Sequence, residues 1–499
     1  MTMNNRPDEA PTEVERWGKF EIVFQGPEEN DPYRNGVWFA VFTCGERVVG
    51  VKGFYDGNGT YRLRFMPDRT GRWDYVTASG IRELHGHTGS FICTEASAGN
   101  HGPVQVKDEA HFRYADGTSY HPFGTTCYAW IHQPEEVRRR TIASLAGSPF
   151  NKIRMTVFPK NYSFNASDPV DFPYEGSPET GFDVQRFNPA FFARLEGHIE
   201  ELLALGIEAD LILFHPYDKG RWGFDRMMAE DDDRYLHYIL ARLSAYRNVW
   251  WAMANEYDFM TEKKMEDWDR LFAIVKVEDP YGHLRSIHNG TRMYEPQSVV
   301  MYDHGKEWVT HCSIQHWDVT LVREWRRLYG KPVVIDECLY EGNVPFRWGN
   351  ITAEEMTHRF WEAAVRGGYA GHGETYLHPE GEIWWAKGGT LHGESPARIA
   401  FLRRILEELP ENSTPLFTMR QMETLGVEGE YYLGYFGIHR PAYFVATLDE
   451  MGAYRADIID TWEMTVTPVD ETLSGTCIIQ LPAKPGMALR IRRLQPVSS

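Results

Sequence analysis

The chain's 499 residues are too many for one hydrophobic core, so we expect two or three domains. Its 52 Lys and Arg residues against 71 Asp and Glu give a formal net charge of −19, a field that disfavours nucleic acid and anionic membranes as partners. A neutral substrate fits this charge better. The aromatic share of 14% suits sugar stacking and β-sheet cores equally well.

The first part of the chain, residues 1–105, is expected to form a β-sandwich domain. Short apolar segments such as FEIVF and VWFAVFT alternate with turn sequences such as DGNG and DRTG, a spacing typical of antiparallel sheets. The following AGNHGP has the composition of a linker. The first residues lack a basic segment followed by an apolar one, which favours a cytoplasmic protein, although a chain whose signal peptide had been removed would look the same.

Residues 106–410 show a different pattern, in which short apolar segments alternate with helical ones. Eight apolar segments occur, from FGTTCYAW to YAGHGETY, and most have a clear helix after them, such as FNPAFFARLEGHIEELLALG. The fifth helix, near EPQSVV, is the least clearly marked. These repeated units predict a parallel (β/α)8 TIM barrel. The alternative is a doubly wound open sheet, but the Gly-rich phosphate turn that would favour it is missing after the first strand.

Residues 411–499 return to strand-like segments, including YYLGYFGI, AYFVATL and TCIIQLP. They predict a small C-terminal β-sandwich domain. The expected fold class is therefore α/β, with a catalytic TIM barrel between an immunoglobulin-like N-terminal sandwich and this smaller C-terminal one.

Functional side chains of a parallel barrel gather at the C-terminal ends of its strands. The polar side chains that close the apolar segments here are Thr125, Thr126, Arg154, His215, Asn255, Glu256, His288, Asn289, Gln315, His316, Trp317, Asp336, Glu337, His372 and Glu374.

Two glutamates among them, Glu256 in WWAMANEYD and Glu337 in VVIDE, end buried-looking strands in the same way. The fourth and seventh strands lie opposite each other, so these carboxylates would face across a sugar-sized gap. Retaining glycosidases use such a pair about 5–5.5 Å apart. Asn255 could bond the sugar 2-hydroxyl. A lone Glu256 would more often be an exposed acid or a structural ion-pair partner, but the matching Glu337 favours the catalytic interpretation. The neighbouring Asp336 and Asp258 are expected to be structural.

An apolar fourth strand that closes on Asn-Glu, with a second Glu closing the seventh, resembles clan A of the glycoside hydrolases. The resemblance implies that Glu256 is the acid/base and Glu337 the nucleophile. The segment FRYADGTSYHPFGTTCYAWIHQ is similar to the apiosidase-like family of glycosidases. The front region, with TYRLRFMPDRTGRWDY, looks like the sandwich domain that often precedes such barrels, and the C-terminal region resembles the small β domain that follows them.

The remaining strand ends and one loop supply candidate substrate-binding residues. His215 is equally compatible with a structural hydrogen-bonding role, and Glu374 could bind hydroxyls or only balance nearby charge. Trp384 and Trp385 are expected in a loop over the barrel mouth, where exposed indoles would stack on sugar. With Asn255, the predicted substrate-binding residues are His215, His316, Trp317, His372, Glu374, Trp384 and Trp385. Thr126, Tyr128 and Arg154 are weaker candidates.

No pattern in the sequence indicates a metal or another cofactor, so none is expected. The six cysteines form no CxxC, and HExxH and GxSxG are absent, which disfavours a zinc site and a serine nucleophile. The edge strands of two sandwiches make a homo-oligomer an open option.

The sequence therefore predicts a retaining glycosidase that is exo-acting on small plant-type oligosaccharides or glycosides. One alternative is a non-catalytic carbohydrate-binding protein on a barrel scaffold. Another is an inverting hydrolase, whose carboxylates would lie about 6.5–9.5 Å apart. Pentofuranosides and hexopyranosides are both compatible with the sequence.

Overall fold

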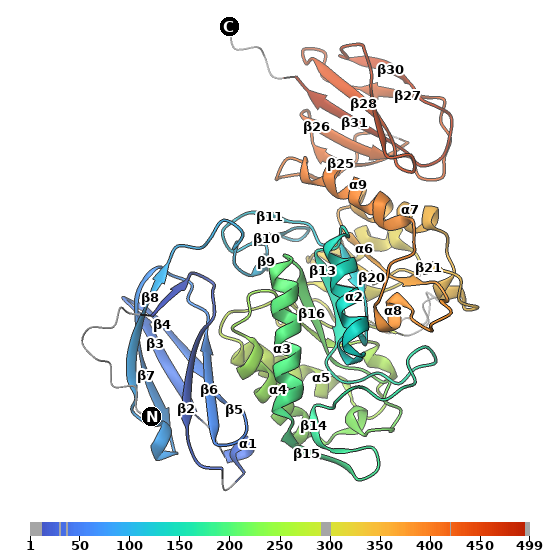
Figure 1. Ribbon diagram of the computed structural model, residues 1–499. Coiled ribbons are helices and arrows are strands. Elements are labelled where there is room, and N and C mark those ends of the chain that lie inside the picture. Colours follow the sequence, from blue (N-terminus) through green and yellow to red (C-terminus); the bar gives the residue numbers. More distant parts are fainter. Residues whose placement is uncertain (1–11, 29–30, 36–37, 291–300, 420, 495–499) are drawn as a thin grey trace.

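The N-terminal region of the computed structural model is a β-sandwich of two antiparallel-rich sheets (Figure 1). The structure describes residues 12–28, 31–35, 38–290, 301–419 and 421–494. One sheet has the order β1-β8-β7-β3-β4 and the other β2-β6-β5. Phe20, Trp38, Phe42, Trp73 and Phe91 fill the space between the sheets. The strands are β1 (Glu13–Glu15), β2 (Phe20–Gln25), β3 (Trp38–Cys44), β4 (Arg47–Lys52), β5 (Phe54–Tyr55), β6 (Thr60–Phe65), β7 (Gly71–Ser79) and β8 (Thr88–Thr94), with the short helix α1 (Pro32–Asn35).

The middle region is an eight-stranded parallel barrel, as predicted. Its strands follow chain order around the ring, and an isolated parallel bridge between His288 and Ser313 joins the two ends of the sheet. The barrel strands are β12 (Gly124–Thr126), β13 (Lys152–Thr156), β16 (Glu208–Phe214), β17 (Val249–Ala254), β18 (Arg285–Ser286), β19 (Cys312–Gln315), β20 (Val333–Glu337) and β22 (Tyr369–His372). β17 and β20 are thus the fourth and seventh strands.

Helices surround this barrel on the outside (Figure 1). They are α2 (Glu135–Ala146), α3 (Pro189–Ala204), α4 (Ala229–Leu243), α5 (Met265–Glu278), α6 (Val322–Tyr329), α7 (Ala353–Val365), the short α8 (Trp384–Lys387) and α9 (Ser395–Glu407). The helix expected near 295–300 lies outside the described residues. Asn188 caps α3 by accepting from the Ala190 amide, and Pro189 follows at the first helical position, so the local sequence sets where this helix begins.

Short additional strands complete the barrel region. The sheet β11-β10-β9 places Phe112 and Tyr120 against Trp250 and closes the N-terminal end of the barrel. The C-terminal ends of the barrel strands lie at the opposite end, away from this sheet. The additional strands are β9 (Val104–Val106), β10 (Phe112–Tyr114), β11 (Ser119–Tyr120), the hairpin β14 (Tyr174–Ser177) and β15 (Gly181–Phe187), and the pair β21 (Glu341–Gly342) and β23 (Glu374–Thr375).

The C-terminal region is a second, smaller β structure that lies beside α7 and α9 (Figure 1). A six-stranded sheet of order β24-β25-β26-β31-β28-β29 is accompanied by the pair β27-β30. These strands are β24 (Thr414–Leu416), β25 (Glu423–Val427), β26 (Tyr431–Tyr435), β27 (Tyr443–Thr447), β28 (Tyr454–Asp460), β29 (Thr465–Pro468), β30 (Thr476–Gln480) and β31 (Met487–Arg493). The predicted fold class is confirmed. In the described ranges, every helix falls short of the length and apolarity that crossing a bilayer requires.

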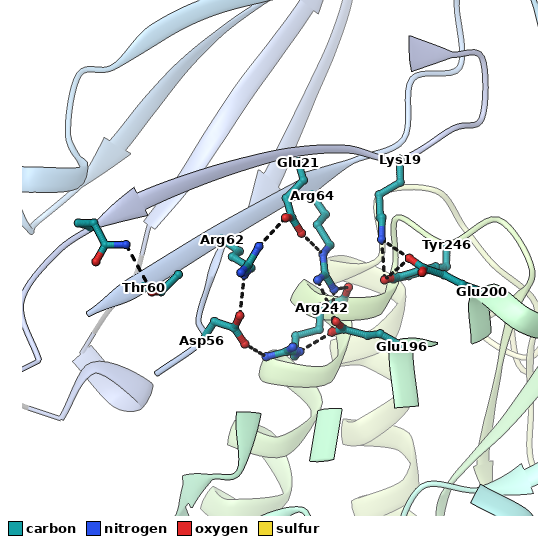
Figure 2. Close-up of polar contacts among 11 residues, drawn as sticks. Lys19, Glu21, Asp56, Thr60, Arg62, Arg64, Glu196, Glu200, Arg242 and Tyr246 are labelled. Atoms are coloured by element: carbon teal, nitrogen blue, oxygen red, sulfur yellow. Dashed lines mark hydrogen bonds and ion pairs between the residues drawn. The ribbon is translucent and has the colours of Figure 1, made fainter. Parts of the chain in front are cut away.

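A closed ring of alternating charges joins the N-terminal sandwich to the barrel (Figure 2). Neighbouring members of the ring lie 2.6–2.9 Å apart. Four members belong to the sandwich, and Glu196 of α3 and Arg242 of α4 belong to the barrel. In ring order the members are Glu21, Arg62, Asp56, Arg242, Glu196 and Arg64. Three carboxylates and three guanidiniums balance one another at this junction.

Candidate active site

Two glutamates lie at the C-terminal ends of the fourth and seventh barrel strands. Glu337 is the last residue of β20, and Glu256 follows β17 after Asn255. Their exposed fractions are only 6% and 7%, so both residues are nearly buried. Glu256 has a left-handed backbone with φ of 49°, which costs on the order of 1–3 kcal/mol and is typical of functional positions. Gly290 makes room for it, because a Cβ there would lie 2.5 Å from Glu256 Cγ.

Glu337 is surrounded by donors. Its Oε1 accepts hydrogen bonds from the Tyr128 hydroxyl and from Arg154 Nη1 at 3.3 Å, and His288 Nε2 also lies 3.3 Å away. Burial alone would raise the pKa of Glu337, but the neighbouring His288, the charge of Arg154 and the hydrogen bond of Tyr128 hold it well below its usual range. Glu337 is therefore an ionised carboxylate.

Glu256 has the opposite environment. Its Oε1 accepts from Gln315 Nε2 at 3.2 Å, and its buried Oε2 has no hydrogen-bond partner within the described residues. Burial, together with the negative charge of Glu337, raises the pKa of Glu256 to about 8, against the opposing effects of Lys160 and Gln315. Glu256 is therefore protonated at neutral pH and able to act as an acid.

Asn255 is held between two donors. Its Oδ1 accepts from Arg154 Nη2 at 2.7 Å and shares the proton of the Tyr128 hydroxyl, 3.3 Å away, with Glu337. Because the oxygen is engaged in this way, the amide nitrogen is the group that Asn255 can offer to a ligand.

A buried charge network supports the site from inside the barrel. Lys152 Nζ donates to Asp210 and Asp336, each at 2.7 Å. The Ser313 hydroxyl also donates to Asp336, at 2.6 Å, and lies 3.0 Å from His288 Nδ1. Asp336 is thus engaged within the barrel interior, as expected for a structural carboxylate, and it connects through Ser313 and His288 to Glu337.

A family model described as the catalytic domain of the apiosidase-like family matches residues 106–410. The chain belongs to the apiosidase-like family. Two further models, both described as domains of unknown function (DUF5060 and DUF5605), match residues 13–80 and 421–492 of this family member. No curated protein matches it.

Solved structures similar to this apiosidase-like chain include a "putative glycoside hydrolase" from Bacteroides vulgatus. It shares 40% sequence identity with a TM-score of 0.92, over 97% of this chain and 100% of that one. A glycoside hydrolase family 5 structure from the same organism matches at 14% identity with a TM-score of 0.60, over 80% of this chain and 96% of that one, which shows a shared fold. The family model and the first of these structures support glycoside hydrolase function.

In the apiosidase-like barrel, four of the predicted binding residues form hydrogen bonds with other residues of the chain. His215 contacts the backbone on both sides, through the Phe158 carbonyl at 3.1 Å and the Tyr217 amide at 3.1 Å. Glu374 accepts from the backbone amides of the loop before α9. His372 and Trp384 both bond the Thr125 hydroxyl, at 2.9 Å. None of the contacts described for these four side chains reaches Glu256 or Glu337, and their substrate roles stay predictions.

The expectation of a loop with exposed indoles at Trp384 and Trp385 is wrong. The two residues begin the short helix α8 and are only 2% and 5% exposed. Consecutive positions on this helix point in different directions, so Trp384 packs into the core between barrel and helices while Trp385 turns toward the site. Trp385 lies edge-on to Tyr128, with ring centroids 5.5 Å apart.

The sixth strand is followed by His316 and by Trp317, whose side chain is partly exposed. His316 Nδ1 accepts from the Asp318 amide at 2.9 Å, and its ring stacks on Trp317 with centroids 5.9 Å apart. Trp317 is 37% exposed, so its indole is available to a ligand. Trp317 stays a predicted stacking platform.

The structure adds residues that the sequence-based set of binding residues lacks. Tyr128 and Arg154 were weaker candidates, and His288 and Gln315 appeared only as strand ends, yet all four contact Asn255 or one of the two glutamates. Lys160 has no counterpart in the predictions. A lysine inside the apolar, aromatic segment VFPKNY was the available signal.

Proposed function

We propose that this chain is a retaining glycosidase in which Glu337 is the nucleophile and Glu256 the acid/base. The observation that carries the proposal is the opposite tuning of the two carboxylates: Glu337 is ionised by its donors while Glu256 is kept protonated. A double displacement needs this combination in the free enzyme.

In the first step, a Glu337 oxygen forms a bond to the anomeric carbon as the bond from that carbon to the leaving oxygen breaks. The leaving oxygen takes the proton of Glu256. In the second step, water gives a proton to Glu256 while its oxygen bonds the anomeric carbon, and the electron pair of the ester returns to Glu337. Asn255 would donate its amide N–H to the 2-hydroxyl, a contact that strengthens in the transition state.

The enclosure of the site supports action on the ends of small oligosaccharides or glycosides. Both carboxylates are nearly buried, and the ring of Trp385 lies edge-on to Tyr128, which bonds Glu337, and 4.8 Å from Trp348 between centroids. Aromatic rings beside nearly buried carboxylates fit a terminal sugar better than the interior of a long polymer.

The test is hydrolysis of a panel of aryl pentofuranosides and hexopyranosides by the wild type, Glu337→Gln, Glu256→Gln and the exposed control Glu266→Gln. We expect both site variants to lose about 10²–10⁴-fold in kcat/KM and the control to stay near wild type. The first-formed anomer, followed by NMR, should have the configuration of the substrate. An inverted product, or a wild type that binds sugars without hydrolysing any glycoside, would contradict the proposal.

A further inference from the structure

Lys160 is a buried cation at the candidate active site without a counter-ion in contact. The residue is 3% exposed, and no carboxylate of the described residues lies within 4.0 Å of its ammonium. Aromatic faces surround it instead. Nζ lies 3.6 Å from the ring centroid of Tyr128, 4.2 Å from that of Tyr217, 4.5 Å from that of Trp385 and 5.2 Å from that of Tyr162.

Aromatic rings stabilise a cation less strongly than a carboxylate in direct contact with it would. Keeping a buried ammonium charged among rings alone therefore costs free energy. Burial lowers the pKa of Lys160, whereas the negative charges of Glu256 and Glu337 act to raise it and so favour the ammonium. The charged and titratable groups that face Lys160 are Glu256, Glu337, Arg154 and Lys219, with the hydroxyls of Tyr128, Tyr162 and Tyr217.

The two glutamates that act on Lys160 exchange charge during a double displacement. In the free enzyme Glu337 carries the negative charge and Glu256 is neutral. Once Glu337 is esterified it is neutral, and Glu256, having given up its proton, carries the charge until water restores it. Arg154 and His288 contact Glu337 but not Glu256. They therefore do not stabilise the negative charge once it lies on Glu256.

We propose that Lys160 is a positioning residue for Glu256, whose ammonium is the fixed cation that compensates the negative charge as it moves from Glu337 to Glu256. This inference rests on the proposed function. The aromatic cage keeps the ammonium from forming a permanent pair with either carboxylate, so it can serve both states. Its largest effect falls on the second step, in which ionised Glu256 must activate water.

The first test measures turnover of a dinitrophenyl glycoside by wild type and Lys160→Met. Methionine keeps the length and apolar contacts of the side chain and removes the charge. We expect kcat to fall about tenfold to a hundredfold, which is part of the rate enhancement that a general base contributes. Because the second step becomes slower, the glycosyl-enzyme should accumulate, so KM should fall as well and a burst of dinitrophenolate should appear. Azide, which attacks without a base, should restore turnover and give the glycosyl azide.

Two further variants separate charge from structure. Lys160→Arg keeps a cation and should retain most of the activity, without a burst. Lys219→Met removes an exposed lysine 5.9 Å from the Tyr162 ring and should behave like wild type. An unchanged kcat without a burst in Lys160→Met would overturn the inference. So would a loss confined to KM on glycosides that carry a carboxylate, which would make Lys160 a substrate-binding residue instead.

A second test needs no turnover and decides on Lys160 even if the wild type hydrolyses no glycoside. In a Glu337→Gln background, which mimics the esterified nucleophile, the pKa of Glu256 is followed by NMR of labelled glutamate. Adding Lys160→Met should raise that pKa by about 1 or more, because the ammonium no longer favours the carboxylate. An unchanged pKa would contradict the inference while leaving the proposed function intact.

Discussion

Arg154 bonds Asn255 and Glu337 at the same time. Its Nη2 lies 2.7 Å from the Asn255 amide oxygen and its Nη1 3.3 Å from Glu337 Oε1. The guanidinium is planar and buried, so it fixes the position of the amide on the fourth strand relative to the carboxylate on the seventh. The Tyr128 hydroxyl contacts the same two side chains.

Arg154→Lys should therefore damage the site although it keeps the charge. A lysine ammonium has its donors on a single nitrogen, so it cannot bond Asn255 and Glu337 at the same time in the same geometry. We expect kcat/KM on an aryl glycoside to fall about 10²-fold, similar to the loss of one preorganised donor at other active sites. Arg139→Lys, in an exposed pair with Glu135, is the control and should leave activity unchanged. A variant of Arg154 within about twofold of wild type would show that the bridge is dispensable.

The pH dependence of kcat/KM follows from the opposite tuning of the glutamates. The pKa of Glu256, raised to about 8, keeps the acid protonated below that pH, so kcat/KM should fall as pH rises through about 8. Glu337 has a pKa held well below its usual range, so kcat/KM should stay level as pH falls through about 4.3, the ordinary value for Glu. Glu256→Gln, assayed on a glycoside whose leaving group needs no proton, should lose the alkaline fall. A fall that persists in this variant would assign it to another group.

Two tryptophans that the sequence assigns to substrate binding, Trp317 and Trp384, should respond differently to substitution. Trp317 is 37% exposed, whereas Trp384 is 2% exposed and bonds Thr125. Trp317→Ala should raise KM about fivefold to tenfold with little effect on the unfolding temperature, because stacking on a sugar is lost. Trp384→Phe should lower the unfolding temperature and leave KM unchanged. The reverse pattern would place the stacking surface at Trp384.

The sequence predicted the barrel and the positions of Glu256 and Glu337 at two strand ends because both depend on local patterns. Apolar strands followed by helices define the eight units, and Glu256 and Glu337 close two of those strands directly. The family resemblance pointed to the same pair. Such features need only the order of residues along one strand.

Side-chain direction and tertiary partners could not be predicted in the same way. Whether Trp384 or Trp385 faces the site depends on the short helix α8, which has only four residues and no strong periodic signal. The tuning of Glu337 depends on Tyr128, Arg154 and His288, which come from three different parts of the barrel. A lysine such as Lys160 usually marks a solvated surface, and only the packing of four rings around it reveals a buried cation.

The ring of charges in Figure 2 should make the N-terminal sandwich and the barrel depend on each other for stability. Arg242 is 1% exposed as a side chain and bonds both Asp56 of the sandwich and Glu196 of the barrel. Arg242→Met leaves these two carboxylates without their shared cation, so we expect a loss of about 3–5 kcal/mol in the free energy of unfolding by urea. Arg186→Met, in an exposed pair with Glu175, should cost less than about 1 kcal/mol. If Arg242→Met proved equally mild, the charges at the junction would be compensated by solvent, and the two regions could unfold independently.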